Sequence, residues 1–156
     1  MKELRLRIDE LMNSFSLLHS SREVSLAFTN AQRAKMFLGM VLKYTEGNPN
    51  PYPESTNTKN TVIEKMADKA IKTFADMDSW KLLIVTNTNT DPTDLQTLKV
   101  KFFRNELDSI ELQLSSISLN MLSPLAEKWH WQSYFALVEC KLWLGMELNR
   151  IFELKK

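Results

Sequence analysis

The chain has 156 residues, 44% hydrophobic and 25% charged, which is typical of one globular domain with a modest core. Its net charge of +1 is too small to favour binding to duplex DNA through bulk charge. Only 3 glycines are present, which argues against glycine-rich phosphate loops and favours helices. No apolar run is long enough to span a membrane, and the first residues lack the apolar core of a signal peptide. We therefore expect a single helical domain, residues 1–156, in the cytoplasm.

The first predicted element is a helix over Met1–His19. Its apolar residues recur at spacings of four and three, which makes a narrow apolar seam, and charged residues cover the opposite side. Such a seam usually faces the core or a subunit contact. We expect that role for Leu4, Ile8, Leu11, Phe15 and Leu18.

The stretch over residues 22–75 predicts a helical hairpin with a rigid elbow. Ser20 and Glu23 have the spacing of a capping box that would begin its first helix. Three prolines within residues 48–53, NPNPYP, prevent that helix from continuing. Apolar residues resume helical spacing over residues 62–74, which predicts the second helix of the hairpin.

Three motifs occur in order along this hairpin: LAFTNAQRAKMFLGMVL, then NPYPES, then VIEKMADKA. They resemble the hairpin of the phage anti-CBASS sponge family, which the Thoeris anti-defence sponges share. The resemblance covers about residues 22–75 and implies a small, all-helical homo-oligomer. It also implies a bacteriophage immune-evasion protein, which binds cyclic oligonucleotide second messengers without cleaving them and hides them from bacterial immune effectors.

The C-terminal part predicts a second helical hairpin, residues 91–156. Residues 80–86 are apolar and β-branched; a short strand and a helix end are possible there, but we favour a buried extended connector because a lone strand has no partner. An Asp-Pro pair at 91–92 begins a helix predicted to reach Met121, and a Ser-Pro pair at 123–124 begins a final helix. The expected seam of the final helix includes Trp129, Phe135, Val138, Leu142, Leu144, Leu148 and Ile151.

A weak internal repeat relates the two hairpins: MFLGM, which contains Gly39, matches LWLGM, which contains Gly145. Glycine within a helix costs about 1 kcal/mol relative to alanine, so its presence in both copies indicates close helix–helix approach. Chance similarity between two amphipathic helices explains the match equally well. The polar residues are not repeated, since Glu139 stands where the first copy has Arg33. We therefore expect the second hairpin to be a scaffold that binds no ligand, in a dimer or trimer.

Nothing in the sequence points to catalysis, a metal or a cofactor. The two histidines, His19 and His130, have no second ligand at metal spacing, and His130 between two tryptophans is expected at the surface or an interface. The single Cys140 lies in an apolar helical stretch and is expected to be an inert core residue. The sequence also lacks a P-loop, a dinucleotide fingerprint and a nucleophile elbow.

The candidate ligand site is the polar face of the first hairpin helix, together with an aromatic residue in the elbow. The phosphates of a cyclic dinucleotide need charge-assisted donors, which arginine and lysine supply. Amide and hydroxyl side chains can read base edges, and an aromatic ring can stack on a base. The candidate residues are Arg22, Thr29, Asn30, Gln32, Arg33, Lys35 and Tyr52. Two alternatives stay open: a merely solvated helix face, or a helical adaptor that binds a host immune protein directly.

Overall fold

In the computed structural model of the protein, the described residues are 1–46 and 92–156, and within them the protein is all-α, as predicted. The long helices are α1 (Lys2–Ser14), α2 (Arg22–Glu46), α5 (Pro92–Ser115) and α6 (Pro124–Leu154). Two short 3-10 helices, η1 (Phe15–Leu17) and η3 (Leu119–Met121), follow α1 and precede α6. The predicted elbow at 48–53, the helix over 62–74 and the connector at 80–86 lie outside the described residues.

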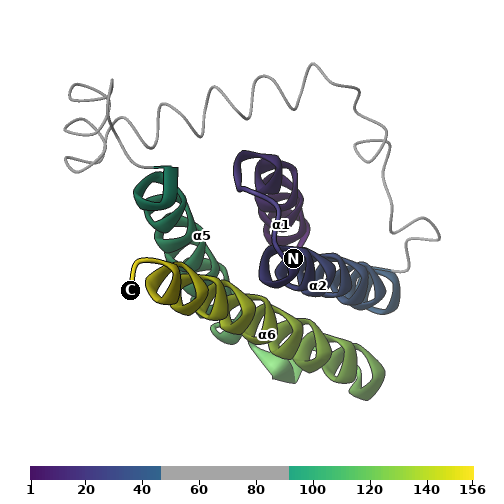
Figure 1. Ribbon diagram of the computed structural model, residues 1–156. Helices are drawn as coiled ribbons and strands as arrows, with labels where there is room; N and C mark the ends of the chain where they lie inside the picture. The colour runs from purple at the N-terminus through teal and green to yellow at the C-terminus, as the bar shows by residue number, and fades with distance from the viewer. Residues whose placement is uncertain (47–91) are drawn as a thin grey trace.

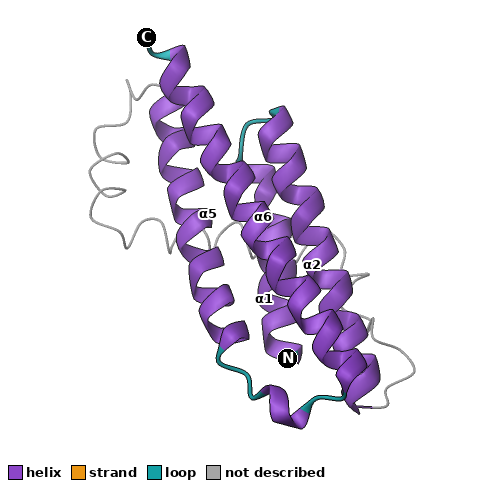
Figure 2. Ribbon diagram, turned by 90° about the horizontal axis from the view of Figure 1, so that it is seen from below, coloured by secondary structure: helices purple, strands orange, loops and turns teal. Residues whose placement is uncertain are grey.

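The four long helices form a bundle in which α1 and α5 lie on one side and α2 and α6 on the other (Figure 1). Each helix contacts two neighbours, in the cyclic order α1, α2, α6, α5. The long axes run side by side, as the view from below shows (Figure 2). The first helix and the C-terminal hairpin therefore share one core with α2, and the two predicted hairpin regions are not separate units in this part of the chain.

The contact between α2 and α6 is the most extensive among the described helices. Small side chains line part of it, and these let two helix backbones come close together there. The hydroxyl of Ser133 on α6 donates to the backbone carbonyl of Ala34 on α2 at 2.9 Å, a bond that such a short side chain makes only at close approach. Ala31, Ala136 and Cys140 are likewise buried in this contact region.

The predicted seam of the first helix is confirmed as core. Its five apolar residues are each 7% exposed or less. Phe15 packs edge to face against Phe28 of α2 and Phe103 of α5, with ring centroids 5.6 and 5.2 Å apart. Such aromatic pairs add about 0.5–1.5 kcal/mol beyond the burial of their area. Phe15 therefore joins three helices at one point.

Helix starts agree with the sequence signals, with one correction. Ser123 caps α6, since its Oγ accepts from the Ala126 backbone N–H at 3.2 Å. At α2 the capping serine is Ser21, whose Oγ accepts from the Val24 N–H at 3.1 Å. The predicted capping box of Ser20 and Glu23 is therefore wrong by one residue.

Two predictions for the C-terminal helices are also wrong. Helix α5 ends at Ser115, and Met121 is 86% exposed rather than part of an apolar seam. On α6, Phe135 and Leu142 are 56% and 62% exposed, although periodicity placed them in the core. The reason is that the core face of α6 is the one with Ala136, Leu137, Cys140 and Leu144, and Phe135 and Leu142 lie on the opposite face of the helix.

His130 is a buried cap of α5, not the surface or interface histidine that its neighbours suggested. It is 1% exposed, and its Nε2 lies 2.8 Å from the carbonyl oxygen of Leu114. A carbonyl only accepts, so Nε2 carries the proton and donates it. Leu114 lies in the last turn of α5, where carbonyl groups have no partner within the helix.

Gly145 does not provide a close approach of two helix backbones. A methyl group at this position would lie 3.7 Å from Cζ of the Arg104 side chain on α5, which is an ordinary van der Waals distance. Glycine therefore destabilises the helix at this position through its larger loss of backbone entropy on folding. The surrounding atoms leave room for a methyl group, so packing does not require glycine here.

We expect Gly145→Ala to raise the free energy of unfolding by about 0.5–1 kcal/mol, because alanine has the higher helix propensity and its methyl group fits beside Arg104. Urea denaturation of the purified protein measures this. Ala136→Gly, on the same helix but within the α2–α6 contact, is the matched control and should lose stability. A destabilised Gly145→Ala variant would show that the backbone does need glycine there.

Candidate functional site

An open hollow of about 620 Å³ lies between the end of α1, η1 and the first turns of α2. Its volume falls in the range of small-molecule sites, about 300–1,000 Å³. The rings of Phe15 and Phe28 contribute apolar surface, and Met12, Leu18 and Val24 extend it. Polar side chains share the lining: Asn13, Ser16, Ser20, Ser25 and Thr29. Aromatic surface beside neutral hydroxyl and amide groups suits a flat heteroaromatic ligand with hydrogen-bonding edges.

Two of the predicted ligand residues belong to this hollow or lie next to it. Thr29 lines it, and its hydroxyl donates to the Ser25 carbonyl at 3.0 Å, which leaves the oxygen lone pairs able to accept. Gln32 is exposed and lies one turn beyond Thr29 on the same side of α2. Thr29 is therefore placed to meet a ligand in the hollow, and Gln32 lies beside it.

Lys35 lies further along α2, outside the hollow, and is paired with Asp9 of α1. The two side chains are only 15% and 18% exposed. Partial burial strengthens their attraction and raises the cost of leaving either charge alone. A phosphate would have to compete with Asp9 for this lysine.

Arg33 lies one turn beyond Thr29 on the exposed face of α2, and its side chain reaches Glu139 of α6. Its Nη1 is 3.2 Å from the Glu139 carboxylate and 3.1 Å from Oδ1 of Asn30. The Arg33 and Glu139 side chains are 49% and 52% exposed, and ion pairs of that kind contribute only about 0–1 kcal/mol. A second anion can therefore approach Arg33 at small cost.

Asn30 differs from the role first expected for it, whereas Arg22 lies at an exposed position. Asn30 is 5% exposed, and its Nδ2 donates to the Leu26 carbonyl of its own helix at 3.0 Å. It orients Arg33 and is not placed to read a base. Arg22 is exposed at the first position of α2, on the same face as Thr29 and Arg33. Tyr52 lies outside the described residues.

The predicted residues therefore have different neighbours along α2. Thr29 lines the hollow and Lys35 pairs with Asp9 of α1, whereas Arg33 pairs with Glu139 of α6. Sequence reasoning missed the α1 side of the hollow, Asn13 and Ser16, because nothing in the local pattern tells which helix will pack beside α2.

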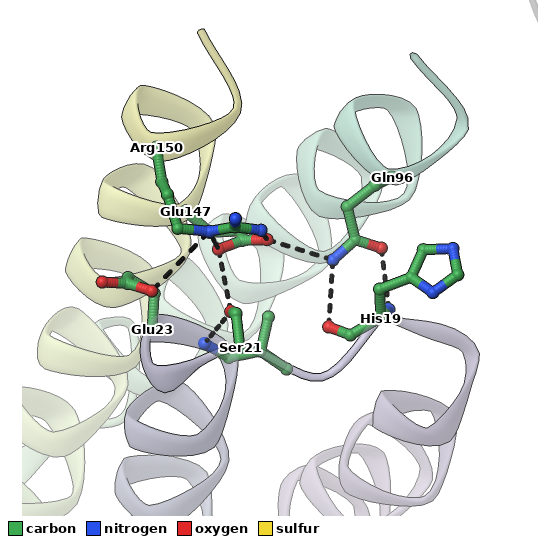
Figure 3. A network of polar contacts seen from close by, with 7 residues as sticks. His19, Ser21, Glu23, Gln96, Glu147 and Arg150 are labelled. Carbon is green, nitrogen blue, oxygen red and sulfur yellow. Dashed lines mark hydrogen bonds and ion pairs between the residues drawn. The ribbon is translucent and has the colours of Figure 1, made fainter. Parts of the chain in front are cut away.

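A buried carboxylate holds the loop that borders the hollow (Figure 3). Glu147 of α6 is 0% exposed and accepts from Arg150 Nε and Nη2 at 2.8 and 2.7 Å. It also accepts from Ser21 Oγ at 2.8 Å and from Gln96 Nε2 at 3.3 Å. The Gln96 amide in turn bonds the backbone N–H and carbonyl of His19, at 2.9 and 3.3 Å.

Burial alone would raise the pKa of Glu147, but the hydrogen bonds from Arg150, Ser21 and Gln96 and the Arg150 charge outweigh it and lower the pKa. The carboxylate therefore stays charged in the native protein. Its described partners are Ser21 at the start of α2, Gln96 of α5 and Arg150 of α6, which makes the carboxylate an anchor for the start of α2.

A second cluster of polar side chains, Lys141 with Asp108 and Glu111, joins α6 to α5. Lys141 Nζ donates to Asp108 at 2.6 Å and to Glu111 at 2.9 Å. Burial lowers the pKa of Lys141, but these hydrogen bonds and charges outweigh it, so the net pKa is raised.

Burial and the nearby Glu111 charge raise the pKa of the Cys140 thiol to about 12, against a hydrogen bond with the Ala31 backbone that lowers it. The expectation of an inert core cysteine is confirmed for its burial and protonation.

Within residues 1–46 and 92–156, no group of three or more His, Cys, Asp or Glu side chains is placed to hold a metal ion. In the same stretches, no helix has the length and apolar character needed to cross a membrane. Comparison with known proteins finds no family model, no curated protein and no solved structure that the chain matches. The functional argument therefore depends on the residues themselves.

We expect the free energy of unfolding to fall as the pH drops below about 4.5, the ordinary pKa of a glutamate. The native Glu147 has the lower pKa, so the unfolded chain takes up this proton first, and the contribution is lost as the pH falls through the native pKa. Glu147→Gln should flatten this part of the profile. It should also cost roughly 1.5–3 kcal/mol at neutral pH, because it weakens hydrogen bonds to a charged group.

Urea denaturation across the acidic range measures both effects. Glu153→Gln is the matched control, since Glu153 is exposed on the same helix and pairs only with the exposed Lys156 among the contacts described for it. A Glu147→Gln profile that keeps the slope of the natural protein would contradict the assignment.

We expect Cys140 to resist alkylation by iodoacetamide in the native protein at neutral pH, because the thiol is 0% exposed and its pKa is about 12. Modification should become fast once urea unfolds the chain. Mass spectrometry of samples quenched at successive times follows the reaction. Rapid labelling of the folded protein would refute the inert-core assignment.

Proposed function

We propose that the protein binds and sequesters a cyclic oligonucleotide second messenger. The observation that supports this most is the hollow beside α2, which is lined by Phe15, Phe28 and several hydroxyl and amide groups. It lies against the same stretch, LAFTNAQRAKMFLGMVL, that resembles the sponge hairpin, and Thr29 belongs to both. In this proposal a base enters the hollow, and the neutral polar groups bond its edges.

The phosphates would be met by cations on the same helix. Arg22 and Arg33 are exposed on the face that also carries Thr29, and Arg33 is held by an exposed ion pair with Glu139 and a hydrogen bond to Asn30. Replacing Glu139 by a phosphate exchanges one charge-assisted bond for another, so the exchange costs little. Lys35 is a weaker candidate, because its pairing with Asp9 is mostly buried.

The proposed mechanism is sequestration by mass action, in which the messenger stays intact and is withheld from its effector. In support, the titratable groups with shifted pKa values that lie near α2 serve internal contacts: Glu147 binds Arg150, and Cys140 stays protonated. We propose accordingly that the protein is not an enzyme and that it acts as a homo-oligomer in the host cytoplasm.

The second candidate function is a helical adaptor that binds a host immune protein. It is favoured by the large side chains on the outer face of α6, where Trp131, Phe135 and Leu142 are exposed. An adaptor predicts no response to nucleotides.

We expect cyclic di- and trinucleotides to raise the melting temperature of the protein, and linear mononucleotides to leave it unchanged. A thermal-shift screen over such a panel tests this, and the bound nucleotide should be recovered intact after denaturation. Silence across the whole panel favours the adaptor, while recovery of linear nucleotide in a time-dependent way favours a phosphodiesterase.

For a nucleotide that binds, we expect Arg33→Ala to weaken affinity by about ten- to a hundredfold, since a charge-assisted hydrogen bond contributes roughly 1.5–3 kcal/mol. Ser25→Trp, which fills the hollow from an exposed position, should weaken it as well. Asn105→Trp, at an exposed position of α5, is the matched control. Calorimetry that gives unchanged affinity for both site variants would reject this location.

A further inference from the structure

The described residues that line the hollow beside α2 include no charged side chain. They are apolar, or they carry a hydroxyl or an amide group. A phosphate inside the hollow would give up its water without gaining a counter-charge, and an unpaired charge removed from water is costly. The group that enters the hollow is therefore uncharged, and hydrogen bonds to neutral side chains select it.

Two phenylalanine rings meet at the wall of the hollow, and each is followed in the sequence by a hydroxyl residue. Phe15 and Phe28 pack edge to face, with ring centroids 5.6 Å apart. Phe28 is half-buried, whereas Phe15 is only 6% exposed. Ser16 follows Phe15 in η1, Thr29 follows Phe28 in α2, and both are exposed in the lining. A flat ring that lies against Phe28 therefore has hydroxyl groups from two different elements around it.

The protons of these two hydroxyl groups are already used. Thr29 Oγ1 donates to the Ser25 backbone carbonyl at 3.0 Å, and Ser16 Oγ donates to the Asn13 backbone carbonyl at 3.1 Å. A carbonyl oxygen only accepts and a hydroxyl group has one proton, so neither hydroxyl has a proton left for a ligand. Each oxygen keeps its lone pairs, and both therefore act toward a ligand as hydrogen-bond acceptors.

Two further hydroxyl groups of the lining, those of Ser20 and Ser25, complete the pattern. Both residues are exposed, and a hydroxyl group rotates to donate or accept as its partner requires. A ring edge with an amino group beside a ring nitrogen suits this set, because the amino group donates to Ser16 or Thr29 and the nitrogen accepts from a serine. An aminopurine has such an edge. A purine without the amino group offers no ring donor to the two acceptor oxygens.

We propose that the hollow selects an uncharged purine ring that carries an exocyclic amino group, and that the Ser16 and Thr29 hydroxyl oxygens accept hydrogen bonds from that group. This assignment rests on the proposed function, because it takes the hollow as the place where the base enters. It deepens that function by naming the chemical class of the base and two residues that determine specificity. Since no charge takes part, a free nucleoside carries the whole recognition pattern.

The test compares the binding of adenosine with that of purine riboside, which is adenosine without the amino group. Titrations followed by NMR at millimolar nucleoside give the two dissociation constants. The natural protein should bind adenosine about two- to tenfold more tightly, the effect of one neutral hydrogen bond. Added salt should leave both constants nearly unchanged, because no ion pair forms.

The double variant S16A/T29V removes both acceptor oxygens, and valine keeps the branched shape of threonine. It should weaken adenosine binding to the level of purine riboside and leave purine riboside binding nearly unchanged. A loss of packing would weaken both nucleosides alike, so the ratio of the two dissociation constants reports the acceptor oxygens. Thr45→Val is the matched control, since the exposed Thr45 of α2 donates likewise to the Val41 carbonyl, at 2.7 Å, but lies outside the hollow. It should leave the ratio unchanged.

Equal affinity for the two nucleosides in the natural protein overturns the proposal, and so does a preference that survives in the double variant. Absence of nucleoside binding at millimolar concentrations overturns it as well. Failure of sequestration has a different signature: cyclic oligonucleotides then leave the melting temperature unchanged, while the preference for adenosine over purine riboside remains.

Discussion

The close approach of α2 and α6 is the constraint on which the rest of the bundle depends. The Ser133 hydroxyl of α6 donates to the Ala34 carbonyl of α2, and Phe37 of α2 stacks on Trp129 of α6. Phe135 and Leu142 lie on the outer face of α6, away from this contact, and are exposed. The packing of α2 against α6 therefore joins the N-terminal and C-terminal parts of the described chain, and it leaves an apolar surface on the outer face of α6.

Buried polar groups fix the ends of the helices against this core. Glu147 collects donors from Ser21, Gln96 and Arg150, so the start of α2 is tied to α5 and α6 at one carboxylate. At the opposite end of α6, His130 caps the last turn of α5. A buried charge left without partners costs several kcal/mol, so these groups favour one arrangement of the helices over its neighbours. The loop beside the hollow gains its position from the same contacts.

Two cations of α2, Lys35 and Arg33, differ in their availability to an anionic ligand because their internal ion pairs differ in exposure. Lys35 and Arg33 both have carboxylate partners, but the Lys35–Asp9 pair is mostly buried and the Arg33–Glu139 pair is half exposed. Water screens the exposed pair and weakens it, so an incoming anion displaces Glu139 more easily than Asp9. Sequence spacing gives no reason to prefer Lys35 or Arg33 as the ligand-binding cation. The different burial of their ion pairs gives that reason.

The sequence by itself determined the helices, because capping serines, prolines and apolar periodicity act within a few residues; the seam from Leu4 to Leu18 and the start at Ser123 follow from such local rules. It also placed Thr29 and Arg33 on one polar face of a single helix. Only the tertiary structure decided which faces are buried. Periodicity marks an apolar face without naming the neighbour, so the small-residue contact of α2 with α6, the burial of His130 and the α1 side of the hollow depend on which helix packs against which.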